Sequence, residues 1–121
     1  MKNENVIKDV SKEIEYKGKA YKLVFNLNVM EQIQDEYETL GKWGELTDGT
    51  GKEVNIKALI FGFTCMLNEG IEIKNEEQEE QEPLLTKKQV GRMITELGIN
   101  NMAEKLNETV IESTEPEEKN A

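Results

Sequence analysis

The sequence has no histidine, a single cysteine and a single arginine, and each shortage excludes a class of function. Without histidine, the chain lacks the commonest general base and the commonest metal ligand. One cysteine, Cys65, is too few for an intramolecular disulfide or a zinc site with several thiolates, and no histidine is present to activate it. Arg92 is the only arginine and the lysines are dispersed, so the sequence lacks a basic patch for nucleic-acid phosphates. We therefore expect no enzyme activity, no cofactor, no metal ion and no nucleic-acid partner.

Long apolar runs are also missing. No window approaches the ~18 apolar residues of a membrane span, and residues 1–11 are polar, unlike a signal peptide. Cys65 lies in a short apolar run, residues 58–67, where a free cysteine behaves as a small hydrophobe. These features predict a protein of a reducing cytoplasm that has no membrane partner.

A turn-rich stretch, residues 48–53, has the composition of a calcium loop but not its pattern. The helix–loop–helix type of calcium site needs an oxygen ligand at loop position five, glycine at six and glutamate at twelve. Counted from Asp48, these positions hold Lys52, Glu53 and Leu59. We therefore interpret the stretch as a connector between two helices.

Negative charge is concentrated in two segments of a chain whose formal net charge is −10. Residues 72–82 contain six Glu and one Lys, and residues 112–121 contain four Glu and one Lys. Segments with many like charges and little to bury stay solvated. We therefore predict one domain at 12–111 that contains an acidic loop, preceded by a flexible N-terminus at 1–11 and followed by a disordered acidic tail at 112–121.

The apolar pattern predicts a mainly α fold with a small N-terminal β-hairpin packed on about four helices. Apolar residues alternate on both sides of a glycine-containing turn at residues 17–20, which is typical of a hairpin with one buried face. Asn and Thr caps and terminal glycines then delimit the helices. The expected helices run from Asn28 to Gly41, from Asn55 to Gly70, from Thr86 to Gly98 and from Asn100 or Asn101 onward.

The second predicted helix is apolar around most of its circumference, so most of it must be covered. It is either the central helix of the core, or one side of it docks on another chain. Trp43, in the connection before it, either fills the edge of the core or anchors a partner. Each predicted helix also contains one methionine, which either fills the core or contacts a partner. Our candidates for partner contact are apolar residues of these segments: Trp43, Phe61, Met66, Val90 and Met93.

Three stretches resemble one protein family. They are residues 21–37 (YKLVFNLNVMEQIQDEY), 56–71 (IKALIFGFTCMLNEGI) and 84–101 (LLTKKQVGRMITELGINN). The order of these stretches and their amino-acid sequences are similar to those of tail assembly chaperones of long-tailed, siphovirus-like phages and prophages of Gram-positive bacteria. The resemblance implies a helical protein of the bacterial host cytoplasm that binds the phage tape measure protein. It would keep that protein soluble until tail tube proteins polymerise around it, and a longer form made by frameshifting recruits tube subunits in some relatives.

Two other functions stay open. The chain is alternatively a small acidic regulatory or inhibitory phage protein, such as a decoy or an anti-repressor, or a minor structural virion protein. A chaperone copurifies with a large helical protein and is absent from mature particles, whereas a virion protein remains in them. A decoy captures a DNA-binding protein in a salt-sensitive manner. Self-association is a further open question.

Replacing Glu76, Glu77, Glu79 and Glu80 together by Gln should leave the free energy of unfolding within about 1 kcal/mol of the wild-type value, because a solvated loop contributes little to folding. Thermal unfolding followed by circular dichroism measures the change. A melting temperature many degrees lower would show that these carboxylates stabilise the domain.

Overall fold

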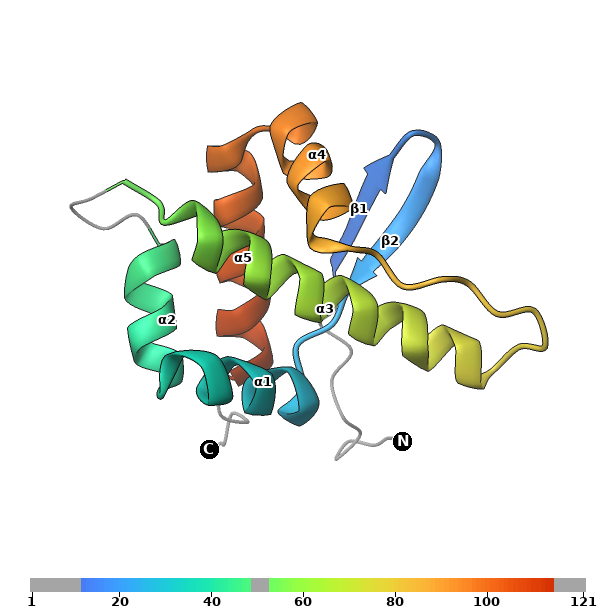
Figure 1. The fold of residues 1–121 in the computed structure, drawn as a ribbon, viewed down its shortest axis with the longest axis horizontal. Coiled ribbons are helices and arrows are strands. Elements are labelled where there is room, and N and C mark those ends of the chain that lie inside the picture. Colours follow the sequence, from blue (N-terminus) through green and yellow to red (C-terminus); the bar gives the residue numbers. More distant parts are fainter. Residues whose placement is uncertain (1–11, 49–52, 115–121) are drawn as a thin grey trace, which may run out of the picture.

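The computed structural model describes residues 12–48 and 53–114, which form a mainly helical fold with an N-terminal antiparallel hairpin (Figure 1). This fold class agrees with the sequence prediction. No helix in the described ranges is long and apolar enough to cross a membrane. The elements in chain order are β1 (Lys12–Tyr16), β2 (Lys19–Leu23), α1 (Leu27–Tyr37), α2 (Leu40–Thr47), α3 (Ile56–Glu76), α4 (Lys87–Leu97) and α5 (Ile99–Thr114).

The hairpin forms as its alternating pattern predicts. Ile14 pairs with Tyr21, and the two-residue turn has positive φ at Lys17 (53°) and Gly18 (78°), which suits the twist of the strands. Ile14 and Leu23 are buried beneath the hairpin. A two-stranded sheet is marginal alone, and here it packs on α3, where the Val24 N–H donates to the Met66 carbonyl at 3.3 Å.

The packing of the hairpin explains why α3 does not end at Gly70 as predicted. A Cβ at this position would lie 2.8 Å from the backbone oxygen of Lys22, so Gly70 permits the close approach of β2. The helix continues to Glu76, which makes residues 72–76 helical rather than part of a solvated loop. Gly70 therefore does not end the helix, and its role is to leave space for the β2 backbone.

The first helix begins and ends earlier than predicted. Asn26 is its cap and accepts from the Val29 N–H at 3.2 Å, and the chain turns at Glu38, whose φ is 75°. A separate short helix, α2, follows where the sequence predicted a connection, with Thr39 as its cap. Eight residues with two glycines have little helical stability of their own. The helix is stabilised by Trp43, which it places in the core.

Trp43 is 1% exposed and packs against α3. Its indole N–H donates to the Ala58 carbonyl at 3.0 Å, and a Cβ at Gly62 would lie 2.3 Å from the ring. Buried Thr47 donates to the Trp43 carbonyl at 3.2 Å and thereby closes the end of α2. Trp43 is therefore a core residue, one of the two roles that the sequence left open.

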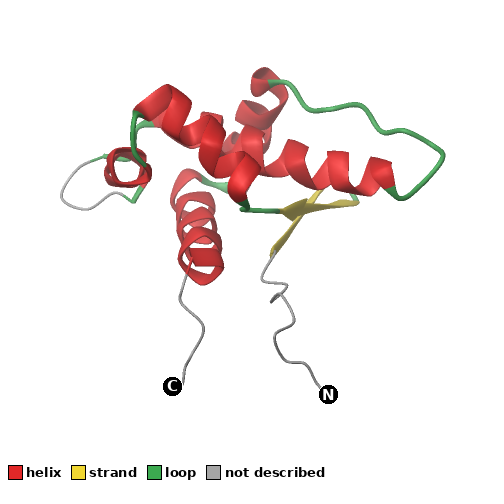
Figure 2. Cartoon of the chain, turned by 90° about the horizontal axis from the view of Figure 1, so that it is seen from below, coloured by secondary structure: helices red, strands yellow, loops and turns green. Residues whose placement is uncertain are grey.

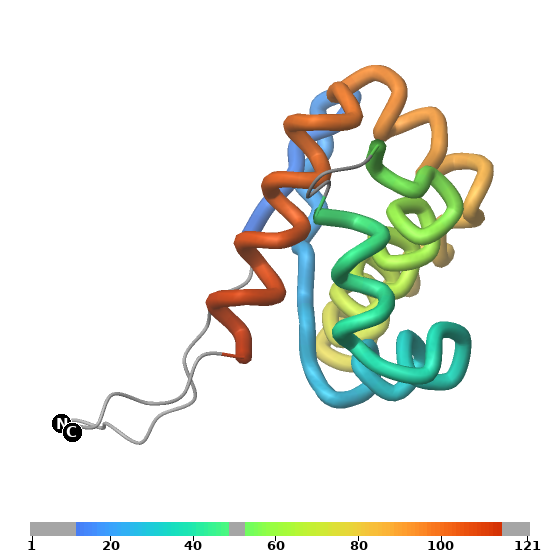
Figure 3. The backbone as a smooth tube through the Cα atoms, turned by 90° about the vertical axis from the view of Figure 1, so that its left-hand side faces the viewer, coloured from blue at the N-terminus to red at the C-terminus, as the bar shows by residue number. Residues whose placement is uncertain are grey.

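The helix predicted from Thr86 to Gly98 follows its signals, whereas α5 begins at Ile99, before the predicted Asn100 or Asn101. Thr86 and Gln89 form a reciprocal capping box, and Gly98 ends α4 with a φ of 101°. Figures 2 and 3 show α5 and the hairpin on the same side of α3. Lys12 of β1 pairs with Glu112 of α5 at 3.2 Å. Residues 112–114 are helical, so the predicted disordered tail starts too early, and residues 1–11 and 115–121 lie outside the described part of the chain.

Residues 77–86, which we call the strap, return alongside α3 and are attached to it. The Asn75 amide donates to the Glu82 carbonyl at 3.0 Å and accepts from the Glu82 N–H at 2.9 Å. Asn68, two turns earlier, binds the backbone of Leu85 in the same reciprocal way, at 3.0 and 2.8 Å. Lys74 and Lys19 hydrogen-bond the Glu82 carboxylate and lower its pKa. The strap has an acidic, exposed middle, as predicted, but defined anchor points.

Replacing Gly62 by Ala should lower the free energy of unfolding by about 1–3 kcal/mol, because the added methyl group overlaps the Trp43 ring and forces α2 away from α3. Urea unfolding followed by Trp43 fluorescence measures the loss. Gly44→Ala is the matched control, since a Cβ there meets nothing within 4 Å. It should raise stability by up to about 1 kcal/mol through helix propensity, and equal losses for both variants would contradict the close packing at Gly62.

Candidate functional site

The structure separates the five residues that the sequence proposed for partner contact. Phe61 is half-buried and lines a surface hollow. The other four side chains are buried to at least 99%, so they cannot touch a second chain in this conformation. Their proposed role in partner contact is wrong for the folded chain, because each faces a neighbouring element within the core. These four are Trp43, Met66, Val90 and Met93.

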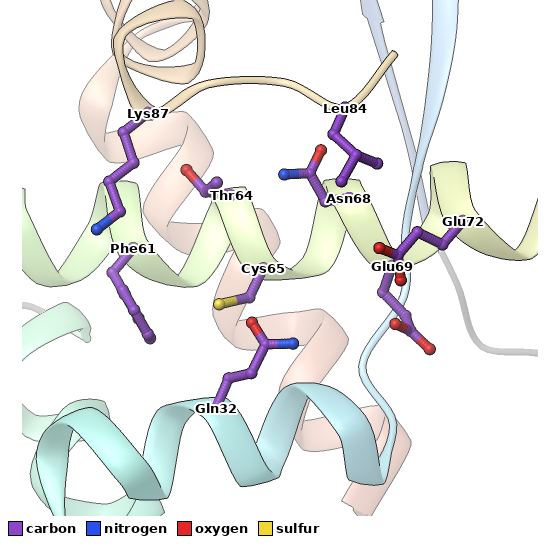
Figure 4. Close-up of a pocket in the computed structure, with 9 residues that line it drawn as sticks. All are labelled: Gln32, Phe61, Thr64, Cys65, Asn68, Glu69, Glu72, Leu84 and Lys87. Carbon is purple, nitrogen blue, oxygen red and sulfur yellow. The ribbon is translucent and has the colours of Figure 1, made fainter. Parts of the chain in front are cut away.

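A groove with an apolar floor runs along the outward side of α3. It consists of two adjoining hollows of about 490 and about 230 Å³ that share Phe61 and Lys87. We call their union the α3 groove. The larger hollow is lined by Glu36, Tyr37, Ile56, Lys57, Ile60, Phe61, Lys87 and Lys88. The smaller, drawn in Figure 4, is lined by Gln32, Phe61, Thr64, Cys65, Asn68, Glu69, Glu72, Leu84 and Lys87.

Three segments build the groove. Residues of α3 form its floor, α1 forms one wall, and the end of the strap with the start of α4 forms the other (Figure 4). The capping box at Thr86 and the attachment of Leu85 to Asn68 place Lys87 at the edge of this second wall. The walls are thus held by hydrogen bonds between polar side chains and backbone, and the floor remains open.

Apolar and aromatic groups line the larger hollow. The rings of Tyr37 and Phe61 meet edge to face, with centroids 5.6 Å apart and an angle of 71° between their planes. Ile60 is half-buried beside Gly91 of α4, and Ile56 is 45% exposed at the open end. An edge-to-face aromatic pair contributes about 0.5–1.5 kcal/mol beyond area burial. The pair therefore gives the floor a defined shape.

Positive charge borders this apolar floor. The Lys87 ammonium lies 5.2 Å from the centroid of the Phe61 ring, within the range of a cation–π contact. Lys57 and Lys88 line the same hollow, and Glu36 lies on the opposite wall. The groove therefore combines an apolar floor with one cationic side.

The smaller hollow contains the only thiol of the chain, and it is unreactive. Cys65 is 8% exposed, and burial raises its pKa to about 11, although the nearby Lys87 charge opposes this shift. A thiol with this pKa is protonated at neutral pH, and the thiolate is the nucleophilic form. Cys65 is therefore a packing residue.

Glu69 is a buried carboxylate held by two neutral amides. One oxygen, Oε2, accepts from Asn26 Nδ2 at 2.8 Å and from Asn28 Nδ2 at 3.1 Å, and the side chain as a whole is 8% exposed. These hydrogen bonds join the entry of α1 to α3 and so set the position of the α1 wall. Sequence reasoning assigned Asn28 to a helix cap and missed Glu69. The available signal was the repeated asparagine in the stretch Asn26-Leu27-Asn28.

No group of three or more Cys, Asp or Glu residues is placed to hold a metal ion within residues 12–48 and 53–114. Comparison with known protein families, with curated proteins and with solved structures finds no match to this chain. An apolar floor between two walls has the shape to accept apolar side chains of another molecule.

Replacing Glu69 by Ala should lower the free energy of unfolding by about 1–3 kcal/mol, because both asparagine amides lose a buried acceptor. Chemical denaturation at neutral pH measures the effect. Glu69→Gln, whose side-chain oxygen can still accept from both amides, is the matched control and should lose less than half as much. Equal losses would show that the carboxylate's charge, rather than its acceptor geometry, stabilises this junction.

Proposed function

We propose that this chain is a phage tail assembly chaperone that binds the tape measure protein and keeps it soluble in the host cytoplasm during tail morphogenesis. The single observation that carries the proposal is the α3 groove, with its apolar floor of Ile56, Ile60 and Phe61 between two walls. The resemblance of residues 21–37, 56–71 and 84–101 to this family supports the identity of the partner.

The length of the groove along α3 suits a bound helix. Its lining on α3 extends from Ile56 to Glu72, a rise of about 24 Å, which accommodates about four turns of a bound helix. Helices that dock in grooves present apolar anchors at every third or fourth residue, and the groove offers apolar contacts at Ile56 and Ile60, one turn apart. A long helical partner would expose such a stripe repeatedly until other proteins cover it.

The charge distribution suits the holding of such a partner in solution. Much of the net charge of −10 lies outside the groove, since the strap alone contains four glutamates and no lysine or arginine: Glu77, Glu79, Glu80 and Glu82. Complexes coated with like charge repel one another, which opposes aggregation. The chain thus covers apolar surface with one side and presents carboxylates to solvent on others.

Ile56→Asp should abolish capture of the tape measure protein without unfolding the domain, because Ile56 is 45% exposed at the first position of α3, where an acidic residue is favourable. The measurement is co-expression with the tape measure protein, followed by a solubility assay and a pull-down. Phe61→Asp should have the same effect on capture, with circular dichroism to show whether the fold survives. We expect at least a tenfold loss of copurified partner for both variants.

Ile111→Asp is the matched control, since Ile111 is 57% exposed on α5, away from the groove. It should capture the partner like the wild type. If the tape measure protein stays insoluble with wild-type chain, the chaperone proposal is wrong. Retention of the chain in mature particles would instead favour a structural virion protein.

A further inference from the structure

Three lysines line the larger hollow of the α3 groove. No carboxylate within the described residues lies within 4.0 Å of the Lys57, Lys87 or Lys88 ammonium. Lys12, Lys19, Lys42 and Lys74 pair with glutamates, whereas Lys17, Lys22 and Lys105, elsewhere in the described part of the chain, also have no described carboxylate within 4.0 Å. What distinguishes Lys57, Lys87 and Lys88 is that they gather around one apolar floor in a chain of net charge −10.

The charge is asymmetric across the groove. Lys87 and Lys88 lie on the α4 wall, whereas Glu36 lies on the α1 wall and Glu72 lines the far end of the smaller hollow. Lys87 extends from the start of α4 toward Phe61, and its ammonium lies 5.2 Å from the centroid of the Phe61 ring (Figure 4). A ligand that fills the floor with apolar side chains therefore places its neighbouring groups beside these ammonium groups.

We infer that the α3 groove selects an amphipathic helix of a partner protein whose apolar stripe is bordered by carboxylates placed to meet Lys87 and Lys88 of α4 and Lys57 of α3. This inference rests on the proposed function only in that the natural source of the helix is the tape measure protein. The apolar stripe supplies the area buried on the floor, and the carboxylates pair with the three lysines. A helix with lysines beside its stripe would meet like charge, which gives the groove its selectivity.

A second copy of the chain is a poorer occupant. The large apolar side chains that α5 exposes are Ile99 and Ile111, which are more than three turns apart and form no continuous stripe. The exposed leucines, such as Leu27 at 77% and Leu84 at 46%, lie singly on other segments. The described part of the chain therefore presents no helix that matches its own groove.

The test uses two designed helical peptides of about 18 residues with the same leucine and methionine stripe, one with glutamates beside the stripe and one with lysines. Fluorescence anisotropy measures their binding to the full chain. The acidic peptide should bind about tenfold more tightly than the basic one, the combined effect of three exposed ion pairs. In the variant Lys57→Glu/Lys87→Glu/Lys88→Glu this preference should invert.

The matched control is Lys17→Glu/Lys22→Glu/Lys105→Glu, which changes the net charge equally but replaces lysines that do not line the groove. It should keep the preference for the acidic peptide within about twofold. Equal binding of the two peptides, binding of neither, or an unchanged preference in the groove variant overturns the inference. The inference is also overturned if analytical sedimentation shows that the wild type is a dimer and the groove variant is a monomer. That result would identify a second copy of the chain as the occupant of the groove.

The two proposals fail separately. If the tape measure protein copurifies equally with the wild type and the groove variant, the proposed function stands and the charge selectivity is wrong. If the peptide preference inverts but the tape measure protein is never retained, the selectivity stands and the natural partner is a different acidic-edged helix.

Discussion

Coverage of α3 is the constraint from which the rest of the structure follows. This helix has apolar side chains around most of its surface, and an exposed apolar helix is unfavourable in water. The hairpin, α1, α2, α4 and α5 each pack against part of it. Two glycines make this possible, since Gly62 admits the Trp43 ring and Gly70 admits the backbone of β2. The remaining strip, around Ile56, Ile60 and Phe61, is the floor of the α3 groove.

Polar side chains determine which part of the α3 surface the strap and α1 leave uncovered. Asn68 and Asn75 bind the backbone of the strap, so that it runs beside α3 instead of across its open face. Glu69 binds the asparagines at the entry of α1 and fixes the other wall. Hydrogen bonds of this kind contribute about 1 kcal/mol each to stability. Their larger effect here is geometric, because they keep two walls apart over an apolar floor.

An apolar floor that stays open in a small acidic protein has a cost in solubility, which favours a role in binding. The lysines at its rim limit that cost by keeping charged groups near the exposed rings. In the complex that we propose, apolar burial supplies affinity and these charges supply discrimination between partners. A protein that holds helical segments transiently benefits from this combination.

Local sequence signals were sufficient for some elements and insufficient for others. The hairpin and the start of α4 at the Thr86 cap were predicted correctly, because alternation and capping depend on residues only a few positions apart. The short helix α2 was missed, because its stability comes from Trp43 packing on α3 and not from helix propensity. The predicted end of α3 at Gly70 was wrong because a glycine can equally provide space for a distant strand.

For the candidate site too, some features follow from the sequence and others only from tertiary packing. By itself the sequence determined that the chain is mainly helical, that α3 needs extensive covering, and that residues such as Phe61 are candidates for contact. Only the tertiary structure decided that Phe61 is accessible while Trp43, Met66, Val90 and Met93 are not. It alone gathered Lys57, Lys87 and Lys88 around one hollow. Burial and charge clustering depend on residues far apart in the chain, whereas apolar periodicity and helix capping depend on residues within a few helical turns of one another.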